Sequence, residues 1–494
     1  EKIAEEKIPK VPEKKGFYGK WSEYNFDEAT YDAVIEALYY KDIDIIESDE
    51  KREDAKMNNK DRLVMGKNCV YEMDENYANN NVMIVGGTGS GKTHFVLEPM
   101  LLHTENSSIV VNINKRVLFD KYAPLFAERG YKVLDLNLAH PETSNVSFNF
   151  FHYLKSAKDT RDFAASIVEG SIGASEKQKD PYWNVSASNL LNFVLNFTMD
   201  CVQHPSINHV MFVIQELSKA FIILNAEKEK LSKDEEETMD FLNRVDNYAA
   251  NKCVRSVANG YYNFRYNAKM TGACIISSLI AAIDAVFSEE VIRVSSGSAP
   301  ELAITGLGKE KTVLFITVPP LNKSTHTFSN LIFYQIFKDL FEYAEDHCPN
   351  GELPVPVRLI FDDFACGGTI SGFDKTISII RQKKISVTML LQDFSQLNSM
   401  YGDIKAQTIT NNCDNLVYMG GMDEKSVDKV SRLTNQPFED IFYMPMDKIA
   451  VIRRGNHGAV FTSRYDIDND ETYKILQTRT DKKKAAFPLA AGYG

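Results

Sequence analysis

The chain has 494 residues, enough for two or three domains, and its 44% hydrophobic and 25% charged residues are typical of a soluble globular protein. A formal net charge of -12 argues against a protein that coats nucleic acid with its whole surface, although it leaves room for a local basic track. The seven cysteines form no CxxC pair, so neither a zinc knuckle nor a disulfide framework is indicated, and we expect free thiols in a reducing cytoplasm.

No stretch reads as a membrane span. The most apolar run, Cys274–Phe287, is short and contains Asp284, which favours a buried helix. The chain begins with Glu1 and shows no signal-peptide pattern, so we interpret it as a fragment whose parent protein could carry an N-terminal membrane anchor upstream.

Residues 1–75 form a first segment of charged and mixed composition. Its pattern predicts a helix near Phe26–Leu38 and a short β-ribbon over Arg62–Met73 that turns at Gly66-Lys67-Asn68. Beyond it, short apolar runs alternate with helical patterns, which predicts an α/β domain with a largely parallel sheet covered by helices. The candidate strands are Val82–Val85, Ile109–Ile113, Lys132–Leu136, Thr312–Val318, Arg358–Phe361, Ser386–Leu391 and Leu416–Met419.

These strands divide the α/β domain into two parts, residues 76–183 and 296–475, and the strand signal is missing between them. Residues 184–295 show helical periodicity, as in Leu190, Phe193 and Phe197, and we predict an inserted all-α domain. The charged run Glu227–Asp240 predicts a solvated helix or loop. Residues 476–494 read as a polar tail in which Lys482–Lys484 are expected to be disordered.

The first motif that carries chemistry is G-x-x-x-x-G-K-[ST], with an apolar strand before it and a helical pattern after it. Its residues are Gly86, Gly87, Thr88, Gly89, Ser90, Gly91, Lys92 and Thr93. Glycines let backbone N–H groups point inward around phosphates, Lys92 supplies a cation, and Thr93 supplies a hydroxyl for Mg²⁺. The helix N-terminus adds the positive end of its dipole. The motif predicts a nucleoside triphosphate site, with ATP and Mg²⁺ as cofactors.

The second motif is an apolar strand that ends in two acidic residues, Asp362 and Asp363. Apolar strands ending in Asp are common, but downstream of a phosphate-binding loop the pattern indicates a Walker B element. Asp362 would then hold Mg²⁺ opposite Thr93, and Asp363 would orient or deprotonate the attacking water.

Two further residues follow the acidic pair. Gln392 ends the apolar strand Val387–Leu391, where it could sense the γ-phosphate, and Arg381 lies in a helical pattern, from which it could reach a neighbouring subunit as a finger. The residues alone equally allow a capping Gln392 and a solvated Arg381.

Assembled in order, these pieces resemble the coupling ATPases of type IV secretion, the TraG/TraD-like conjugation motors, in the branch found in Gram-positive mobile elements. The resemblance covers about Val64 to Tyr465. The elements that carry it beside the phosphate-binding loop are Glu98-Pro99, Gly130-Tyr131, Asp180-Pro181-Tyr182-Trp183, Asp362-Asp363-Phe364-Ala365, Arg381 with Ile385, Leu391–Leu397, Tyr401-Gly402 and Asn412-Cys413-Asp414.

The resemblance implies a RecA-like P-loop NTPase domain with an all-α insertion, assembled as a homo-hexamer at the cytoplasmic face of the bacterial plasma membrane. It also implies that Gln392 and Arg381 lie at a subunit interface. The sequence departs from the family pattern in three places. The D-P-K-G element reads Ile113-Asn114-Lys115-Arg116, the N-P element reads Asn149-Phe150, and the second acidic residue is Asp363 instead of Glu. Because positioning dominates this chemistry, the shorter Asp363 predicts secure nucleotide binding but uncertain turnover.

The leading interpretation is therefore an ATP-dependent coupling protein that recruits a relaxase with single-stranded DNA, or a protein substrate, and passes it to a type IV secretion channel. The all-α insertion would face the substrate. Two alternatives stay open: a DNA translocase of another hexameric class, and a nucleotide-gated docking platform that hydrolyses little and recruits secreted proteins. The elements at Leu391–Leu397 and Asp180–Trp183 argue against the translocase, whereas Asp363 and the net acidity keep the platform open.

Overall fold

The computed structural model describes residues 61–73, 79–171, 181–226, 230–297, 299–366 and 369–486. The helix predicted near Phe26–Leu38 and the residue Asp180 lie outside the described residues. The β-ribbon is confirmed: β1 (Arg62–Gly66) pairs antiparallel with β2 (Cys69–Glu72) across a turn at Lys67 and Asn68.

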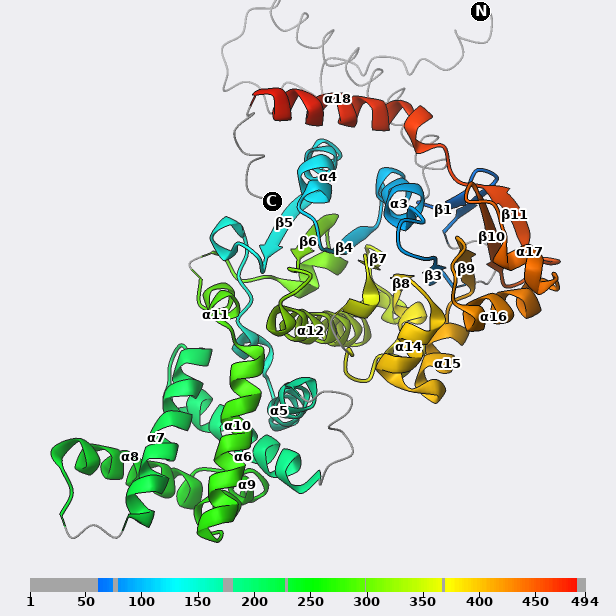
Figure 1. Ribbon diagram of the computed structural model, residues 1–494. Helices are drawn as coiled ribbons and strands as arrows, with labels where there is room; N and C mark the ends of the chain where they lie inside the picture. Colours follow the sequence, from blue (N-terminus) through cyan, green and yellow to red (C-terminus); the bar gives the residue numbers. More distant parts are fainter. Residues whose placement is uncertain are drawn as a thin grey trace, which may run out of the picture. The chain divides into compact units, whose positions relative to one another are not determined.

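A nine-stranded sheet is the centre of the described part of the chain, in the order β11-β10-β9-β3-β8-β7-β4-β6-β5 (Figure 1). From β9 to β5 its strands are parallel. These strands are β3 (Val82–Val85), β4 (Ser108–Ile113), β5 (Lys132–Asn137), β6 (Thr312–Thr317), β7 (Val357–Phe361), β8 (Ile385–Leu391) and β9 (Asn415–Tyr418). All seven predicted strands are confirmed, with ends that differ by one residue at most. They are apolar throughout because both faces of the sheet are covered.

Two strands were missed by the sequence prediction. β10 (Lys448–Arg453) and β11 (Val460–Ser463) form an antiparallel hairpin that extends the sheet beside β9. The alternation in Lys448–Arg453 and the glycine-containing turn after it are the signals that could have revealed them.

Alternate residues of each parallel strand point into two separate cores, one on each face of the sheet. In β3, Val82 and Ile84 face one core and Met83 and Val85 the other. The first core is closed by the β1–β2 ribbon and by α3 (Glu98–Leu102), α4 (Val117–Glu128) and α18 (Glu471–Ala486). The second core is closed by the remaining helices and continues without a break into the all-α region.

The all-α region follows β5 in the chain and extends away from the sheet (Figure 1). Its helices are α6 (Pro181–Cys201), α7 (Ile207–Asn225), α8 (Lys233–Asn251), α9 (Arg255–Arg265), α10 (Lys269–Val286) and α11 (Glu289–Ser295). α5 (Ala157–Ser171), which lies before the predicted start of the insertion, packs against α6 and α10 and so belongs to the same packed unit. By length and composition alone, α7 and α10 could cross a membrane, although no stretch was predicted to; both place one face in the second core.

The other helices on the second face follow β6 and lie along the sheet. They are α12 (Lys323–His347), α13 (Phe373–Ile379), α14 (Phe394–Tyr401), α15 (Asp403–Asn411), α16 (Glu424–Thr434) and α17 (Phe438–Phe442).

The C-terminal segment corrects one prediction. The polar tail expected from residue 476 continues α18 to Ala486, so that Lys482–Lys484 are helical. Tyr473 and Leu476 are buried in the first core, and α18 packs across α4 (Figure 1). The tail looked featureless because these few anchoring side chains are spaced among charged residues.

Candidate nucleotide-binding site

All predicted site residues except Arg381 come together where three neighbouring parallel strands end. The phosphate-binding loop follows β3, Gln392 follows β8, and Asp362 with Asp363 follows β7. In the sheet order, β8 lies between β3 and β7. The carboxyl edge of such a sheet is where α/β proteins bind their ligands.

The phosphate-binding loop is compact: its lysine contacts the loop's own carbonyl oxygens, and one of its glycines packs closely on a neighbouring ring. Gly91 has a φ of +79°, and a Cβ at this position would lie 2.6 Å from the Phe95 ring, so only glycine fits there. The Lys92 ammonium donates hydrogen bonds to the carbonyl oxygens of Gly86 and Gly87 at 2.5 and 3.2 Å. Burial lowers the pKa of Lys92, while the carboxylates of Asp363 and Asp362 act in the opposite direction. A bound phosphate would therefore add to the stabilisation of the charged lysine.

Thr93 and Asp362 form the pair that was predicted to hold a metal ion. The Thr93 hydroxyl donates a hydrogen bond of 2.8 Å to Asp362 Oδ1. Burial raises the pKa of Asp362, and the hydroxyl of Thr93 and the ammonium groups of Lys92 and Lys115 limit that rise. A carboxylate in such a place gains from a divalent cation, because the cation offsets the cost of its burial.

Asp363 adopts a left-handed backbone conformation, with a φ of +68°. Asp is one of the few residues with a side chain that tolerates this region, so the backbone here favours Asp over most alternatives. The buried His326, at the start of α12, lies close enough for Asp363 to affect its titration: burial lowers the pKa of His326 and Asp363 opposes the change.

The structure separates the two remaining candidates. Gln392 lies at the carboxyl end of β8, partly buried, and its backbone N–H donates to Gln396 Oε1 at 2.9 Å. Arg381 is exposed in a 3₁₀ turn, Ile380–Lys383, immediately before β8 begins. Since β8 has seven residues, Arg381 and Gln392 lie about 20 Å apart along the strand. Arg381 is thus remote from the phosphate-binding loop of its own chain.

The helical segment that follows the phosphate-binding loop makes a buried ion pair that was not predicted from the sequence. It begins with a π-helical turn, Thr93–Leu97, in which the Glu98 N–H reaches back to the Thr93 carbonyl. The buried Glu98 carboxylate accepts hydrogen bonds from Lys121 at 2.6 Å and from the Tyr122 hydroxyl at 2.8 Å, both on α4. The partners are more than twenty positions apart in the chain, so no local pattern could have revealed the contact.

Several buried polar atoms at this edge have no hydrogen-bond partner within the described ranges. They are Ser90 Oγ in the loop, Asn112 Oδ1 in β4, Thr317 Oγ1 in β6, Tyr418 Oη in β9 and Arg464 Nε just beyond β11. Buried polar atoms are rarely left unpaired, and their gathering at one edge is typical of a site built for a ligand.

The donor set fits Mg²⁺ in the form in which nucleotide sites hold it. Over the described stretches of the chain, no group of three or more His, Cys, Asp or Glu side chains could hold a metal by itself. Mg²⁺ commonly takes one or two protein oxygens and completes its shell with waters and phosphates, and Thr93 with Asp362 offers that pair.

The fold and this edge define a RecA-like P-loop nucleotide-binding protein. A protein-family model described as Type IV secretory system Conjugative DNA transfer matches residues 40–436, more than half of the chain. The chain belongs to this family, which confirms the family resemblance drawn from the sequence. It therefore serves conjugative DNA transfer through a type IV secretory system.

Solved structures show the same fold. The bacterial conjugative coupling protein TrwB, in a trigonal form with sulphate, aligns with a TM-score of 0.57 and 16% identity over 78% of this chain and 85% of that chain. TrwB with the non-hydrolysable ATP analogue ADPNP aligns with a TM-score of 0.53 and 14% identity over 78% of this chain and 84% of that chain. For TrwB with ADP and Mg²⁺, the TM-score is 0.52 and the identity 14%, over 78% of this chain and 85% of that chain. No curated protein sequence matches the chain.

Proposed function

We propose that this chain is the ATP-hydrolysing coupling protein of a conjugation system, which recruits a transfer substrate and drives or gates its passage into the secretion channel. The observation that carries the proposal is the pairing of Thr93 with Asp362 at 2.8 Å beneath a closed phosphate-binding loop. TrwB, whose fold this chain shares, binds an ATP analogue in one structure and ADP with Mg²⁺ in another, which supports the same cofactors here.

Each side chain at the edge has a role that its position allows. Lys92 and the loop N–H groups would bind the phosphates, and Thr93 and Asp362 would hold the cation. When bound, Mg²⁺ would neutralise charge on the β- and γ-phosphates. Asp363 orients or deprotonates the attacking water, and Gln392, between the loop and the acidic pair, senses whether a γ-phosphate is present.

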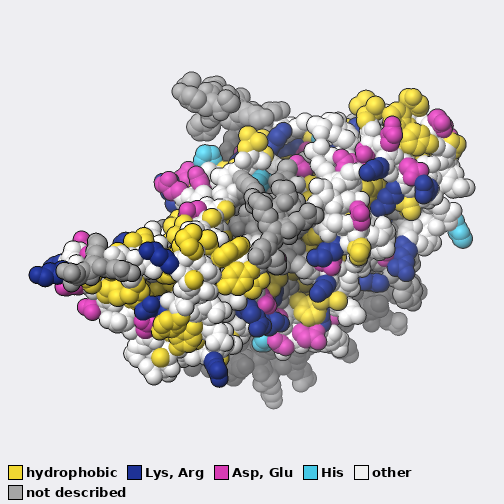
Figure 2. Space-filling view, turned by 60° about the horizontal axis from the view of Figure 1, so that its bottom comes forward, with side chains coloured by type: hydrophobic (Ala, Val, Ile, Leu, Met, Phe, Trp, Pro, Cys, Tyr) yellow, Lys and Arg dark blue, Asp and Glu magenta, His cyan; other side chains and the backbone are white. Residues whose placement is uncertain are grey.

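A groove in the all-α region supports recruitment of a polypeptide. It has a volume of about 660 Å³ and lies between α7 and α8. Phe212 and Ile222, both more than half exposed, and Phe241 give it an apolar lining. Exposed apolar side chains are frequent in this region (Figure 2).

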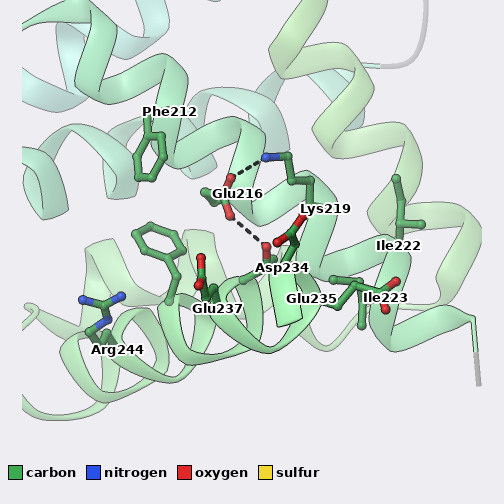
Figure 3. A pocket seen from close by; sticks show the side chains of 11 residues that line it. Phe212, Glu216, Lys219, Ile222, Ile223, Asp234, Glu235, Glu237 and Arg244 are labelled. Carbon is green, nitrogen blue, oxygen red and sulfur yellow. Dashed lines mark hydrogen bonds and ion pairs between the residues drawn. The ribbon is translucent and has the colours of Figure 1, made fainter. Parts of the chain in front are cut away.

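The rim of the groove is acidic at the start of α8, whereas Arg244, further along α8, and Lys219 on α7 add positive charge to its lining. Asp234, Glu235 and Glu237 line it on α8, as Figure 3 shows. At its base, the buried Glu216 carboxylate is held by Lys219 at 2.6 Å and by the Thr238 hydroxyl at 3.0 Å. Apolar side chains beside a surplus of carboxylates suit an amphipathic, basic protein segment better than a phosphate backbone. We therefore assign the groove to the protein part of the cargo, such as a relaxase, and not to DNA.

Membership of this family supports a proposal for the assembly and the location. We propose a homo-hexamer at the cytoplasmic face of the plasma membrane, held by an anchor outside the described residues, in the branch found in Gram-positive mobile elements. In such a ring, Arg381 would enter the site of the neighbouring subunit, which agrees with its distance from its own site.

An ATPase assay with and without single-stranded DNA tests the enzyme function. We expect wild-type turnover that DNA stimulates and that Lys92→Ala abolishes, since Lys92 is the cation of the phosphate-binding loop. Absence of wild-type turnover together with rescue by Asp363→Glu would overturn the motor and favour a docking platform. The left-handed backbone at Asp363 adds a strain of about 1–2 kcal/mol to the Glu variant, so its fold must be checked by thermal denaturation.

A further inference from the structure

The sheet order determines on which side of the phosphate-binding loop a nucleoside extends. The residues for the γ-phosphate and the metal, Gln392 and Asp362, follow β8 and β7, on one side of β3. On the other side of β3 lie β9, β10 and β11. A chain of phosphates that begins over β7 and β8 and crosses the loop therefore leads its sugar and base out over the β9–β11 side.

Arg464 lies on that side, directly after β11. Its guanidinium carbon is 4.9 Å from the centroid of the Phe95 ring, in the first turn of the helix that leaves the loop. Its Nη1 comes within 3.5 Å of the position that a Cβ on Gly91 would occupy. The guanidinium therefore lies beside the loop itself.

One hydrogen-bond donor of Arg464 has no partner among the residues that the structure describes, and one face of its guanidinium lies on Phe95. Its Nε is buried and has no hydrogen-bond partner over the described part of the chain. Burial lowers the pKa of Arg464, and the carboxylate of Asp447 opposes this. A guanidinium has two flat faces, and the Phe95 ring backs one of them.

We propose that Arg464 is a nucleoside-binding residue whose guanidinium, backed by Phe95, stacks on the base of the bound nucleotide. The proposal rests on the nucleotide-binding function proposed above. Stacking uses the flat face that every base presents, so Arg464 supports ATP and GTP alike and makes no distinction between ATP and ADP. Phe95 acts as a positioning residue that holds the guanidinium flat.

Isothermal titration calorimetry with ATP, ADP and inorganic tripolyphosphate, each with Mg²⁺, tests this assignment. Tripolyphosphate occupies the loop but has no nucleoside. Arg464→Ala is expected to weaken ATP and ADP binding about ten-fold and to leave tripolyphosphate binding unchanged. Arg464→Lys should lose as much as Arg464→Ala, because an ammonium has no plane to stack. The matched control is Arg454→Ala, which removes an exposed arginine that pairs with Asp414 in the same hairpin.

Other results of these titrations would overturn the proposal in distinguishable ways. An equal loss for ATP and tripolyphosphate, or full rescue by Arg464→Lys, would show a charge contact to phosphate and overturn stacking. Unchanged affinity for all three ligands would overturn any role of Arg464 in binding. A wild-type chain that binds ATP no better than Lys92→Ala does would overturn the proposed nucleotide function, a result distinct from the failure of Arg464 alone. Thermal denaturation of every variant excludes unfolding as a cause.

Discussion

At the residue scale, the candidate site combines two acidic side chains in different environments. Burial raises the pKa of Asp362, which faces Thr93, whereas Asp363 occupies a left-handed backbone position near Lys92 and His326. The environment of Asp362 suits a carboxylate that binds a cation. At Asp363, a strained backbone turn fixes the direction of a short carboxylate. Asp363, at the position where the resemblance led us to expect Glu, thus has a backbone conformation that favours Asp.

The raised pKa of Asp362 has a consequence for stability. The folded chain binds a proton at Asp362 more tightly than the unfolded chain, so the free energy of unfolding falls as the pH rises from the ordinary aspartate range through the raised pKa. The penalty is complete above that pKa. Asp362→Asn removes it and keeps an oxygen for the Thr93 hydroxyl. We expect a higher Tm than wild type at neutral pH, a difference that shrinks in acid, and loss of the Mg²⁺ dependence of nucleotide binding.

Thermal denaturation over a pH series, with nucleotide titrations at each of two Mg²⁺ concentrations, checks both expectations. Asp363→Asn is the control, because the turn it occupies is next to the pair and does not include the Thr93 contact. An Asp362→Asn variant that is less stable at neutral pH would contradict the assigned burial cost.

At the element scale, α7 and α8 form a groove whose two sides differ in composition. α7 provides Phe212 and Ile222, and the first turns of α8 provide the acidic rim. Ser232 caps α8 in a capping box with Glu235, so part of the acidity also stabilises the helix start. Glu237 lies outside that box, and its charge is available to a ligand.

The charge of Glu237 can be reversed to test the groove. Glu237→Lys is expected to weaken binding of a labelled amphipathic peptide rich in Leu and Lys by roughly three-fold or more, because it replaces attraction by repulsion. Glu236→Lys is the matched control, since Glu236 is exposed on the same helix but does not line the groove. Fluorescence anisotropy with the peptide and with an oligothymidine provides the measurement. Tighter binding of the oligothymidine than of the peptide by the wild-type groove would contradict its assignment to protein.

At the scale of the whole molecule, the position of Arg381 bears on the proposed ring. Its turn precedes β8, at the end of the strand opposite to the phosphate-binding loop, so the proposed contact with a γ-phosphate would be made in another subunit. An arginine supplied in this way typically contributes about a thousand-fold or more to the rate.

Mixed assemblies test the contact between subunits. Arg381→Ala is expected to lose turnover by about a thousand-fold and to keep its ATP affinity, because the phosphates of its own site are bound by the loop. Mixing it with Lys92→Ala subunits, which retain Arg381, should restore part of the activity. Gln382→Ala, in the same exposed turn, is the control. Failure of every mixture to gain activity would contradict the role in trans.

The parallel strands and the phosphate-binding loop could be predicted from the sequence because their signals are local. Each strand is a short apolar run, and the loop is a motif with fixed spacing. The sequence did not predict the β10–β11 hairpin, in which Val460–Ser463 is too short to stand out. Arg464 and the contact of Lys121 with Glu98 are tertiary features, made by residues far apart in the chain, and no spacing marks them. The end of the chain was misjudged because, among the described side chains of α18, only Tyr473 and Leu476 are buried apolar anchors.

The helix α12 connects the surroundings of Asp363 with the all-α region. It begins near Asp363, through His326, and packs against α5 and α10 of the all-α region. The buried ion pair of Lys338 with Asp159 fastens it to α5. With 25 residues, it is about 37 Å long. We therefore expect that a shift of α12 near Asp363 would be transmitted to α5 and α10, the helices of the all-α region that it contacts.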